Sequence, residues 1–180
     1  EIDGFDNLHH AEGMLKDSME RAAAVYGADR TYYMVNGSTG GILSAVCGLT
    51  RPGGKIIMAR NSHKAAYHAV LLNQLIVDEA HGAHFSFGKD FPRSALDCGA
   101  DVVIQSLHKT LPSLTQTALL HIKSKIIEPS EIEGYLPVFQ TSSPSYVFLA
   151  SIENCIRYME QEGRERMHRF AASLERFMES

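Results

Sequence analysis

Short runs of apolar residues, each closed by turn-forming residues, recur along the chain between segments of helical periodicity. This alternation predicts an α/β fold. Five runs predict strands, at residues 31–35, 55–59, 75–77, 102–104 and 118–122. Because several of these runs are continuously apolar, we expect buried parallel strands that are covered on both faces.

Apolar residues with helical spacing predict the helices between these strands. The first helix begins near Met14 and ends at Gly27, a residue that commonly caps helices. Further helices are expected at residues 42–49, from 61 to about 72, and in part of 129–140. A long apolar stripe starts at Val147 and is interrupted near Gly163. We expect this stripe to pack against the sheet or another subunit.

The composition is that of an ordinary globular protein, with 44% hydrophobic and 21% charged residues. A length of 180 residues favours one domain. A net charge of −4, with no basic block, argues against nucleic-acid binding. The absence of a long apolar run or a signal-peptide pattern argues against a membrane protein. Three cysteines (Cys47, Cys98 and Cys155) without a paired pattern favour a reducing compartment, so we expect a cytoplasmic protein.

A glycine-rich segment, residues 36–41, separates the first predicted strand from a helix. A strand, a Gly-rich turn and a helix N-terminus together present free backbone N–H groups, which suit a phosphate. Ser38 and Thr39 add hydroxyl groups, although no lysine follows at the spacing of a Walker A loop. An ordinary capped turn fits this segment equally well.

Reactive side chains also follow three other predicted strands. His63 comes just after the second strand, where a histidine is commonly a hydrogen-bonding residue at a helix start. Asp78 and His81 follow the third strand, and Ser106 and Lys109 follow the fourth. Ligands of open α/β sheets bind at the carboxyl ends of the strands, so a carboxylate and a lysine are expected to face one cleft.

The spacing Asp-x-x-His at one strand end and Ser-x-His-Lys at the next resembles the pyridoxal-phosphate (PLP) site of fold-type I enzymes. Five blocks further resemble the major domain of the ornithine/lysine/arginine decarboxylase family, at residues 1–10, 35–41, 61–64, 77–84 and 106–117. The resemblance implies a three-layer αβα domain with a mainly parallel sheet, of the PLP-dependent transferase-like (aspartate aminotransferase-like) type. It also implies a homodimer or higher homo-oligomer that uses PLP to decarboxylate arginine, lysine or ornithine, as in polyamine biosynthesis.

The resemblance implies roles for the residues around the PLP ring. Lys109 would form the Schiff base with PLP. Asp78 would pair with the ring nitrogen and keep it protonated. His63 would stack on the ring, and His81 would lie beside it.

The remaining matched residues would bind the phosphate of the cofactor. Ser38, Thr39, Ser106 and His108 are the positions that the resemblance assigns to this group. Leu107 stands where the family commonly has threonine, so the phosphate contact of this motif is left to Ser106 and His108.

The chain departs from the family by what it lacks. The major domain has seven strands in the order 3-2-4-5-6-7-1, whereas the five predicted strands correspond to 1, 2, 5, 6 and 7. Without strand 4, backbone groups in the middle of the sheet would be unpaired. We therefore predict that a segment is absent near residues 72–76. With no initiator Met and no C-terminal small domain, residues 1–180 are expected to be an incomplete major domain.

Two other interpretations remain open. Asp78, Glu79, His81 and His84 have the residue types of a metal-dependent hydrolase site, although the lysine motif then has no role. The chain is otherwise a catalytically incompetent, cofactor-free fragment. The favoured interpretation includes no metal.

Overall fold

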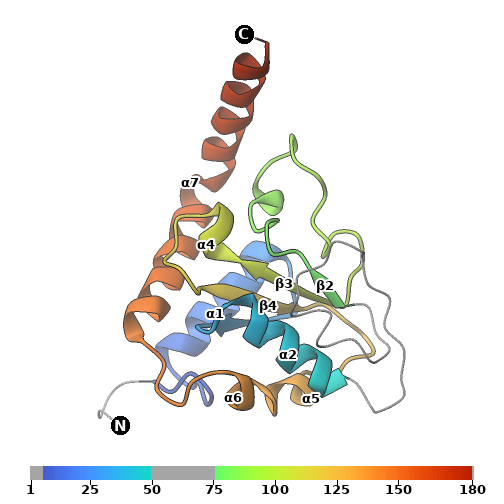
Figure 1. The fold of residues 1–180 in the computed structure, drawn as a ribbon, viewed down its shortest axis with the longest axis vertical. Coiled ribbons are helices and arrows are strands. Elements are labelled where there is room, and N and C mark those ends of the chain that lie inside the picture. The colour runs from blue at the N-terminus through green and yellow to red at the C-terminus, as the bar shows by residue number, and fades with distance from the viewer. Residues whose placement is uncertain (1–5, 50–75, 180) are drawn as a thin grey trace.

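A computed structural model describes residues 6–49 and 76–179 of the chain. Within them, four strands form one sheet in the order β1-β4-β3-β2. Their bounds are β1 (Arg30–Met34), β2 (Ile76–Asp78), β3 (Val102–Ser106) and β4 (Ala118–Ile122). β2 pairs with β3 in parallel, whereas β4 is antiparallel to both of its neighbours. β1, β2 and β3 therefore run in one direction (Figure 1).

The two central strands are buried along their whole length, as their continuous apolar runs predicted. The parallel direction expected from the same runs is wrong for β4, which is antiparallel to both neighbours, because an apolar run reports burial and not strand direction. β1 is an end strand of the described sheet, and Arg30 and Tyr32 on it are more exposed than its other three residues. Four of the predicted strands are thus confirmed to within two residues. The strand predicted at 55–59 lies outside the described residues.

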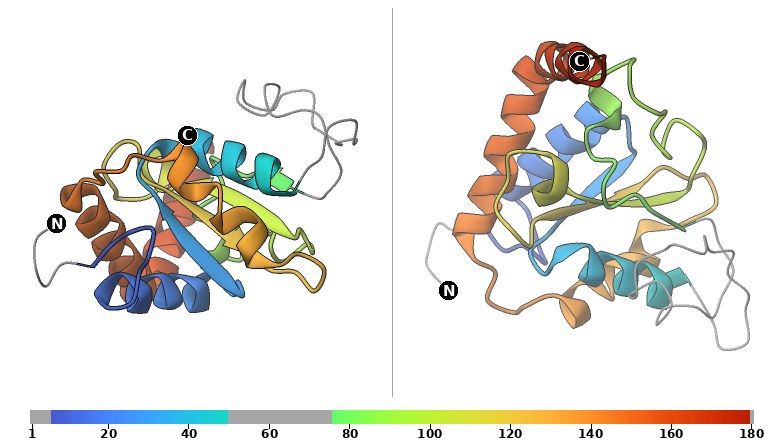
Figure 2. Two further views of the ribbon diagram at one scale, coloured as in Figure 1. Left: turned by 90° about the horizontal axis from the view of Figure 1, so that it is seen from below. Right: turned by 45° about the horizontal axis from the view of Figure 1, so that its top comes forward.

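Helices cover both faces of the sheet (Figures 1 and 2). One face carries α1 (Met14–Tyr26) and α7 (Tyr146–Met178), and the other carries α2 (Gly37–Leu49), α5 (Pro129–Glu133) and α6 (Leu136–Phe139). A 3-10 turn, η1 (Phe85–Phe87), follows β2, and the short helix α4 (Leu107–Thr110) follows β3. The predicted three-layer αβα arrangement is confirmed. No helix within the described ranges is both long and apolar enough to cross a membrane.

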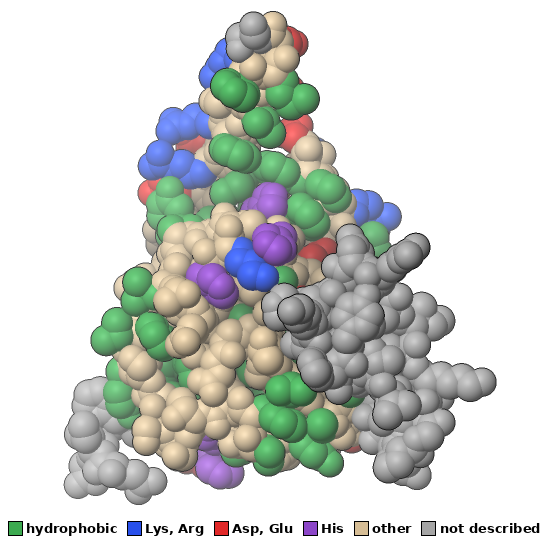
Figure 3. All heavy atoms as spheres, viewed as in Figure 1, with side chains coloured by type: hydrophobic (Ala, Val, Ile, Leu, Met, Phe, Trp, Pro, Cys, Tyr) green, Lys and Arg blue, Asp and Glu red, His purple; other side chains and the backbone are tan. Residues whose placement is uncertain are grey.

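α7 runs without a break through Gly163, so the predicted interruption there is wrong. Gly163 is buried, and a Cβ on it would lie 2.8 Å from Met159 Cε and 3.0 Å from Phe87 Cδ1. The glycine therefore serves close packing against η1. Beyond it, α7 projects from the body of the molecule and exposes apolar side chains, including Phe170 and Leu174 (Figures 1 and 3).

α2 begins at Gly37, so Ser38 and Thr39 lie in the first helical turn and not in the turn predicted before it. A close approach to the sheet explains Gly41. A Cβ on Gly41 would lie 3.3 Å from Ile104 Cγ2 on β3. The small residue lets the helix axis lie near the strand that ends at Ser106.

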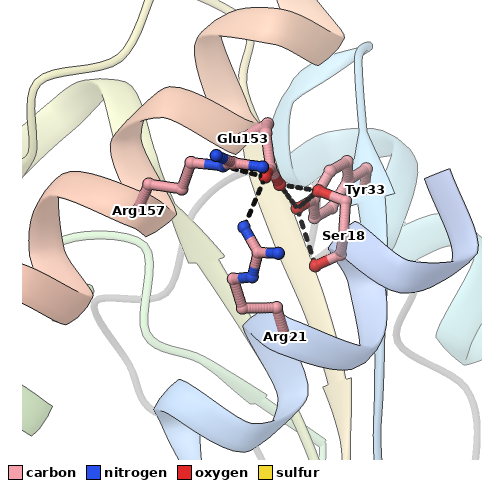
Figure 4. Close-up of polar contacts among 5 residues, drawn as sticks. All are labelled: Ser18, Arg21, Tyr33, Glu153 and Arg157. Carbon is pink, nitrogen blue, oxygen red and sulfur yellow. Dashed lines mark hydrogen bonds and ion pairs between the residues drawn. The ribbon is translucent and has the colours of Figure 1, made fainter. Parts of the chain in front are cut away.

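Glu153 of α7 joins that helix to α1 and β1 (Figure 4). Its carboxylate accepts a hydrogen bond from Ser18 Oγ and lies 3.3 Å from the Tyr33 hydroxyl. Arg21 and Arg157 also contact it, at 2.8 and 2.5 Å. Burial, supported by the Glu153 charge, raises the pKa of the Tyr33 phenol above its usual value. The carboxylate therefore has neutral and cationic donors from three elements.

Replacing Glu153 with alanine should lower the free energy of unfolding by about 1 to 2 kcal/mol, because the buried hydroxyl groups of Ser18 and Tyr33 lose an acceptor. Urea denaturation would measure the change. The matched control is Glu162→Ala, which removes an exposed carboxylate that pairs with Arg166 one turn along the same helix. That change should leave stability unaltered. Equal effects of both variants would contradict the structural role of Glu153.

Candidate functional site

The pairing of β2 with β3 places the predicted carboxylate and lysine at one edge of the sheet. Asp78, the last residue of β2, lies opposite Ile104 in the parallel register. Backbone bonds continue the pairing past the strands, from Glu79 N to Ile104 O (2.9 Å) and from Ser106 N to Ala80 O (3.3 Å). Lys109 follows in the single turn of α4. Asp78 and Lys109 thus leave neighbouring strands at the same carboxyl edge.

The residues that enter β4 bring α2 to this edge as well. Thr117 O accepts hydrogen bonds from Leu107 N (3.1 Å) and His108 Nδ1 (2.9 Å). One residue earlier, Gln116 O accepts a bond from Gly37 N (2.8 Å). Because β4 is antiparallel, it starts where β1 and β3 end. The first turns of α2 and α4 are therefore hydrogen-bonded to the consecutive carbonyl groups of Gln116 and Thr117.

The site residues differ in burial, and Asp78 and His108 are half-buried. Ser106 is fully buried, and its Oγ has no hydrogen-bond partner in the described residues. Ser38 is also buried, whereas Thr39, His81 and Lys109 are exposed. Figure 3 shows histidine side chains beside a lysine or arginine on the face that carries α4. The site thus combines the exposed amine of Lys109 with the buried hydroxyl of Ser106, which has no hydrogen-bond partner among the described residues.

His108 is anchored by its ring. Its Nδ1 donates to Thr117 O, so Nε2 is the ring nitrogen that could bind a ligand. Leu107 beside it is fully buried in the core. Along the motif Ser-Leu-His-Lys, exposure therefore rises from the buried Ser106 and Leu107 through the half-buried His108 to the exposed Lys109.

The four residues of the metal-site interpretation do not converge. Among the residues that the structure describes, no three His, Cys, Asp or Glu side chains are grouped as a metal site requires. The Glu79 carboxylate accepts bonds from Ala95 N and Gln105 Nε2. The His84 ring lies 4.8 Å from both Phe85 and Phe91, and burial lowers its pKa. The hydrolase interpretation has no ligand geometry in these ranges.

A buried polar chain, which was not predicted from the sequence, lies beneath the site. Gln105 Oε1 accepts from His121 Nε2 at 3.3 Å, and His121 Nδ1 accepts from Thr31 Oγ1 at 2.8 Å. Gln105 Nε2 donates to Glu79 at 2.5 Å. Burial lowers the pKa of His121 to about 3, so the ring is neutral. Polar residues inside apolar strands, Gln105 and His121, were the available signal.

Most predicted site residues therefore lie on elements that begin or end at one edge of the sheet. Asp78, Ser106, His108 and Lys109 come from β2, β3 and α4, and Ser38 and Thr39 come from the first turn of α2. His81 lies in the turn after β2. His63 and residues 72–75 of the junction suspected near 72–76 lie outside the described residues, so these predictions are not tested.

Comparison with known proteins agrees with this fold. The family model described as Orn/Lys/Arg decarboxylase, major domain, matches residues 1–76 and 71–179. The uncharacterized protein YaaO of Bacillus subtilis (strain 168) is 31% identical over 226 residues, covering 89% of this chain and 47% of the relative. An arginine decarboxylase of Bacillus anthracis is 27% identical over 225 residues, covering 89% of this chain and 46% of the relative.

Solved structures share the fold. Lysine decarboxylase A from Pseudomonas aeruginosa superposes with a TM-score of 0.82 at 16% identity, covering 94% of this chain and 34% of that chain. The chain spans about half the length of the curated relatives it matches. The aligned 226 residues exceed the 180 of this chain, so the relative has residues inside the alignment that have no counterpart here.

Stability should depend on pH through His121. The pKa of His121 in the folded state, about 3, lies below the ordinary value of 6.5. The contribution of the neutral ring to the free energy of unfolding is therefore fully present above pH 6.5. It is lost as the pH falls toward 3, because the unfolded chain takes up the proton first. Between pH 6 and pH 5 the parent should lose about 1 kcal/mol of unfolding free energy from this residue. His121→Gln keeps an amide donor and should remove this slope in urea denaturation.

The matched control for that measurement is His168→Gln, which removes an exposed histidine from α7. It should keep the parent's pH slope. A slope that survives in His121→Gln would contradict the buried, neutral state of the ring.

Proposed function

Because the chain belongs to the Orn/Lys/Arg decarboxylase family, we propose that the protein carrying it binds PLP and decarboxylates a basic amino acid. Curated relatives named arginine and ornithine decarboxylases support this reaction class. Arginine, lysine and ornithine remain the candidate substrates.

The observation that carries this proposal is the convergence of a carboxylate, an amine and a buried hydroxyl at one strand edge. Ser106 Oγ has no partner among the described residues, and a buried hydroxyl without one costs free energy, so it is expected to have a ligand. Ser106 is the N-cap residue of α4, the helical turn that contains Lys109. Ser38 lies in the first turn of α2, where a helix leaves backbone N–H groups without intrahelical partners and so able to bind an anion. These residues fit a phosphate that is joined to an aldehyde.

Each residue then has a defined task. Lys109 is exposed, so its amine is accessible to the cofactor aldehyde and to water. Asp78 would hold a proton at the pyridine nitrogen, since a carboxylate favours the charged form of its partner. When bound, PLP would supply a ring that accepts the electron pair left when carbon dioxide departs. Ser38 and Ser106 would orient the phosphate and so fix the ring between Asp78 and Lys109.

The cofactor-free interpretation is favoured by a separate observation. The relatives have residues inside the alignment that have no counterpart in this chain, and the family model matches in two pieces that overlap at residues 71–76, which points to one missing segment there. We propose that this segment supplies part of the complete site. Cofactor binding by the chain therefore distinguishes a competent site from an incomplete one.

Replacing Lys109 with alanine should abolish the visible absorbance of lysine-bound PLP, because the amine that holds the aldehyde is gone. The measurement is a PLP titration followed by absorbance. Lys123→Ala is the matched control, since Lys123 is an exposed lysine at the opposite end of β4. An unchanged absorbance in Lys109→Ala would reject the assignment, and no absorbance in the parent would favour the incompetent fragment.

The substrate should be revealed by amine release. The parent is incubated with PLP and with arginine, lysine or ornithine separately, and the amine product is measured. We expect one of the three to react at least about tenfold faster than the others, because a site built to pair a substrate cation rejects misplaced charges. Equal inactivity with bound PLP would contradict decarboxylation.

Replacing Ser106 with alanine should have opposite effects on stability and binding. Without cofactor, the free energy of unfolding should rise by about 1 kcal/mol, because a buried hydroxyl that lacks a partner in the described residues is removed. PLP affinity should fall by about tenfold, because a phosphate contact is lost. Urea denaturation and PLP titration measure the two quantities, and a loss of stability in the cofactor-free protein would contradict the assignment of Ser106.

A further inference from the structure

Glu79 directly follows Asp78, the carboxylate assigned to the ring nitrogen. The Glu79 side chain is instead held by hydrogen bonds from within the protein. Its Oε1 accepts from Ala95 N at 2.8 Å. Its Oε2 accepts from Ser94 Oγ at 3.1 Å and from Gln105 Nε2 at 2.5 Å. Three donors from two separate segments thus hold one carboxylate against the end of β3.

This carboxylate fixes the direction of every hydrogen bond behind it. Because a carboxylate only accepts, Gln105 must turn its amide nitrogen toward Glu79 and its oxygen toward His121. His121 must then carry its proton on Nε2, and its Nδ1 accepts from Thr31 Oγ1. One charge therefore orients a chain of hydrogen bonds that extends from the end of β2 across β3 and β4 to β1.

Gln105 and Tyr26 also hold the turn that follows β2. Gln105 Nε2 lies 3.5 Å from Gly82 O, and the Tyr26 hydroxyl donates to Ala83 O at 3.1 Å. A Cβ on Gly82 would collide with Glu79 Cγ, so the glycine makes room for the glutamate side chain. These contacts thus hold the turn that contains His81 against the Glu79 side chain.

We propose that Glu79 is a positioning residue, which acts through Gln105 and His121 to hold Asp78 and His81 in place for PLP. The inference rests on the proposed function and deepens it. Asp78 precedes Glu79 in the chain, and His81 lies two residues after it, so a shift of Glu79 moves both. At metal sites, residues that orient a ligand from behind typically change affinity by tenfold or more when they are lost, and we expect a similar effect here.

The test compares Glu79→Gln with the exchange variant Glu79→Gln/Gln105→Glu. In the single variant, two amides face each other and one donor loses its acceptor. In the exchange variant, the carboxylate placed at position 105 accepts both from the new amide at position 79 and from His121, which restores the chain of hydrogen bonds with the charge moved to β3. Two readouts are measured by PLP titration, the Kd and the pH midpoint of the visible absorbance of lysine-bound PLP.

Glu79→Gln should weaken PLP binding about tenfold and shift the pH midpoint, since Asp78 no longer holds the ring nitrogen at its set position. The exchange variant should return both values toward those of the parent. Glu153→Ala is the matched control, because it removes a carboxylate that is also held by several donors, but on α1, β1 and α7 instead of at the end of β2. It should lower stability without moving the pH midpoint.

Parent-like Kd and midpoint in Glu79→Gln would overturn this inference while leaving the proposed function intact. Absence of Lys109-dependent absorbance in the parent would overturn the proposed function and this inference with it. If Glu79→Gln does not fold, the exchange variant decides, because parent-like binding supports the chain of hydrogen bonds and lost binding overturns it.

Discussion

The site depends on the parallel pairing of β2 with β3. That register places Asp78 opposite Ile104, and the bond from Ser106 N to Ala80 O extends the pairing past the last residue of β2. A shift by one residue would turn the Asp78 side chain to the other face of the sheet. Asp78 and Lys109 follow the same edge of the sheet because two short backbone segments are held in register.

Register in turn depends on what lies under the strands. β3 has a glutamine among apolar residues, and this glutamine bonds to Glu79 on one side and to His121 on the other. An unpaired amide there would cost free energy, so alternative registers that separate Gln105 from Glu79 are penalised. The buried polar chain thus specifies the same alignment that the backbone bonds stabilise.

Strand positions were predictable because continuous apolar runs leave few alternatives for a short buried segment. The positions of Asp78 and Lys109 at the strand ends were also predictable, since both residues follow such runs. Two features were not. Gly163 was taken as a helix break, because its contact with Phe87 is far away in sequence. The link from Glu79 to Gln105 joins residues 26 apart, and pattern alone does not identify such partners.

The internal difference from the relatives bears on how complete this site is. Within the described residues, β2 is three residues long and lies at one end of the sheet order. Parallel strands are normally buried between neighbours, because an open edge leaves its N–H and C=O groups to water. The relatives have residues inside the alignment that have no counterpart in this chain. In the part of this chain that the structure describes, the hydrogen bonds of Glu79 must hold the end of β2 from the side of β3.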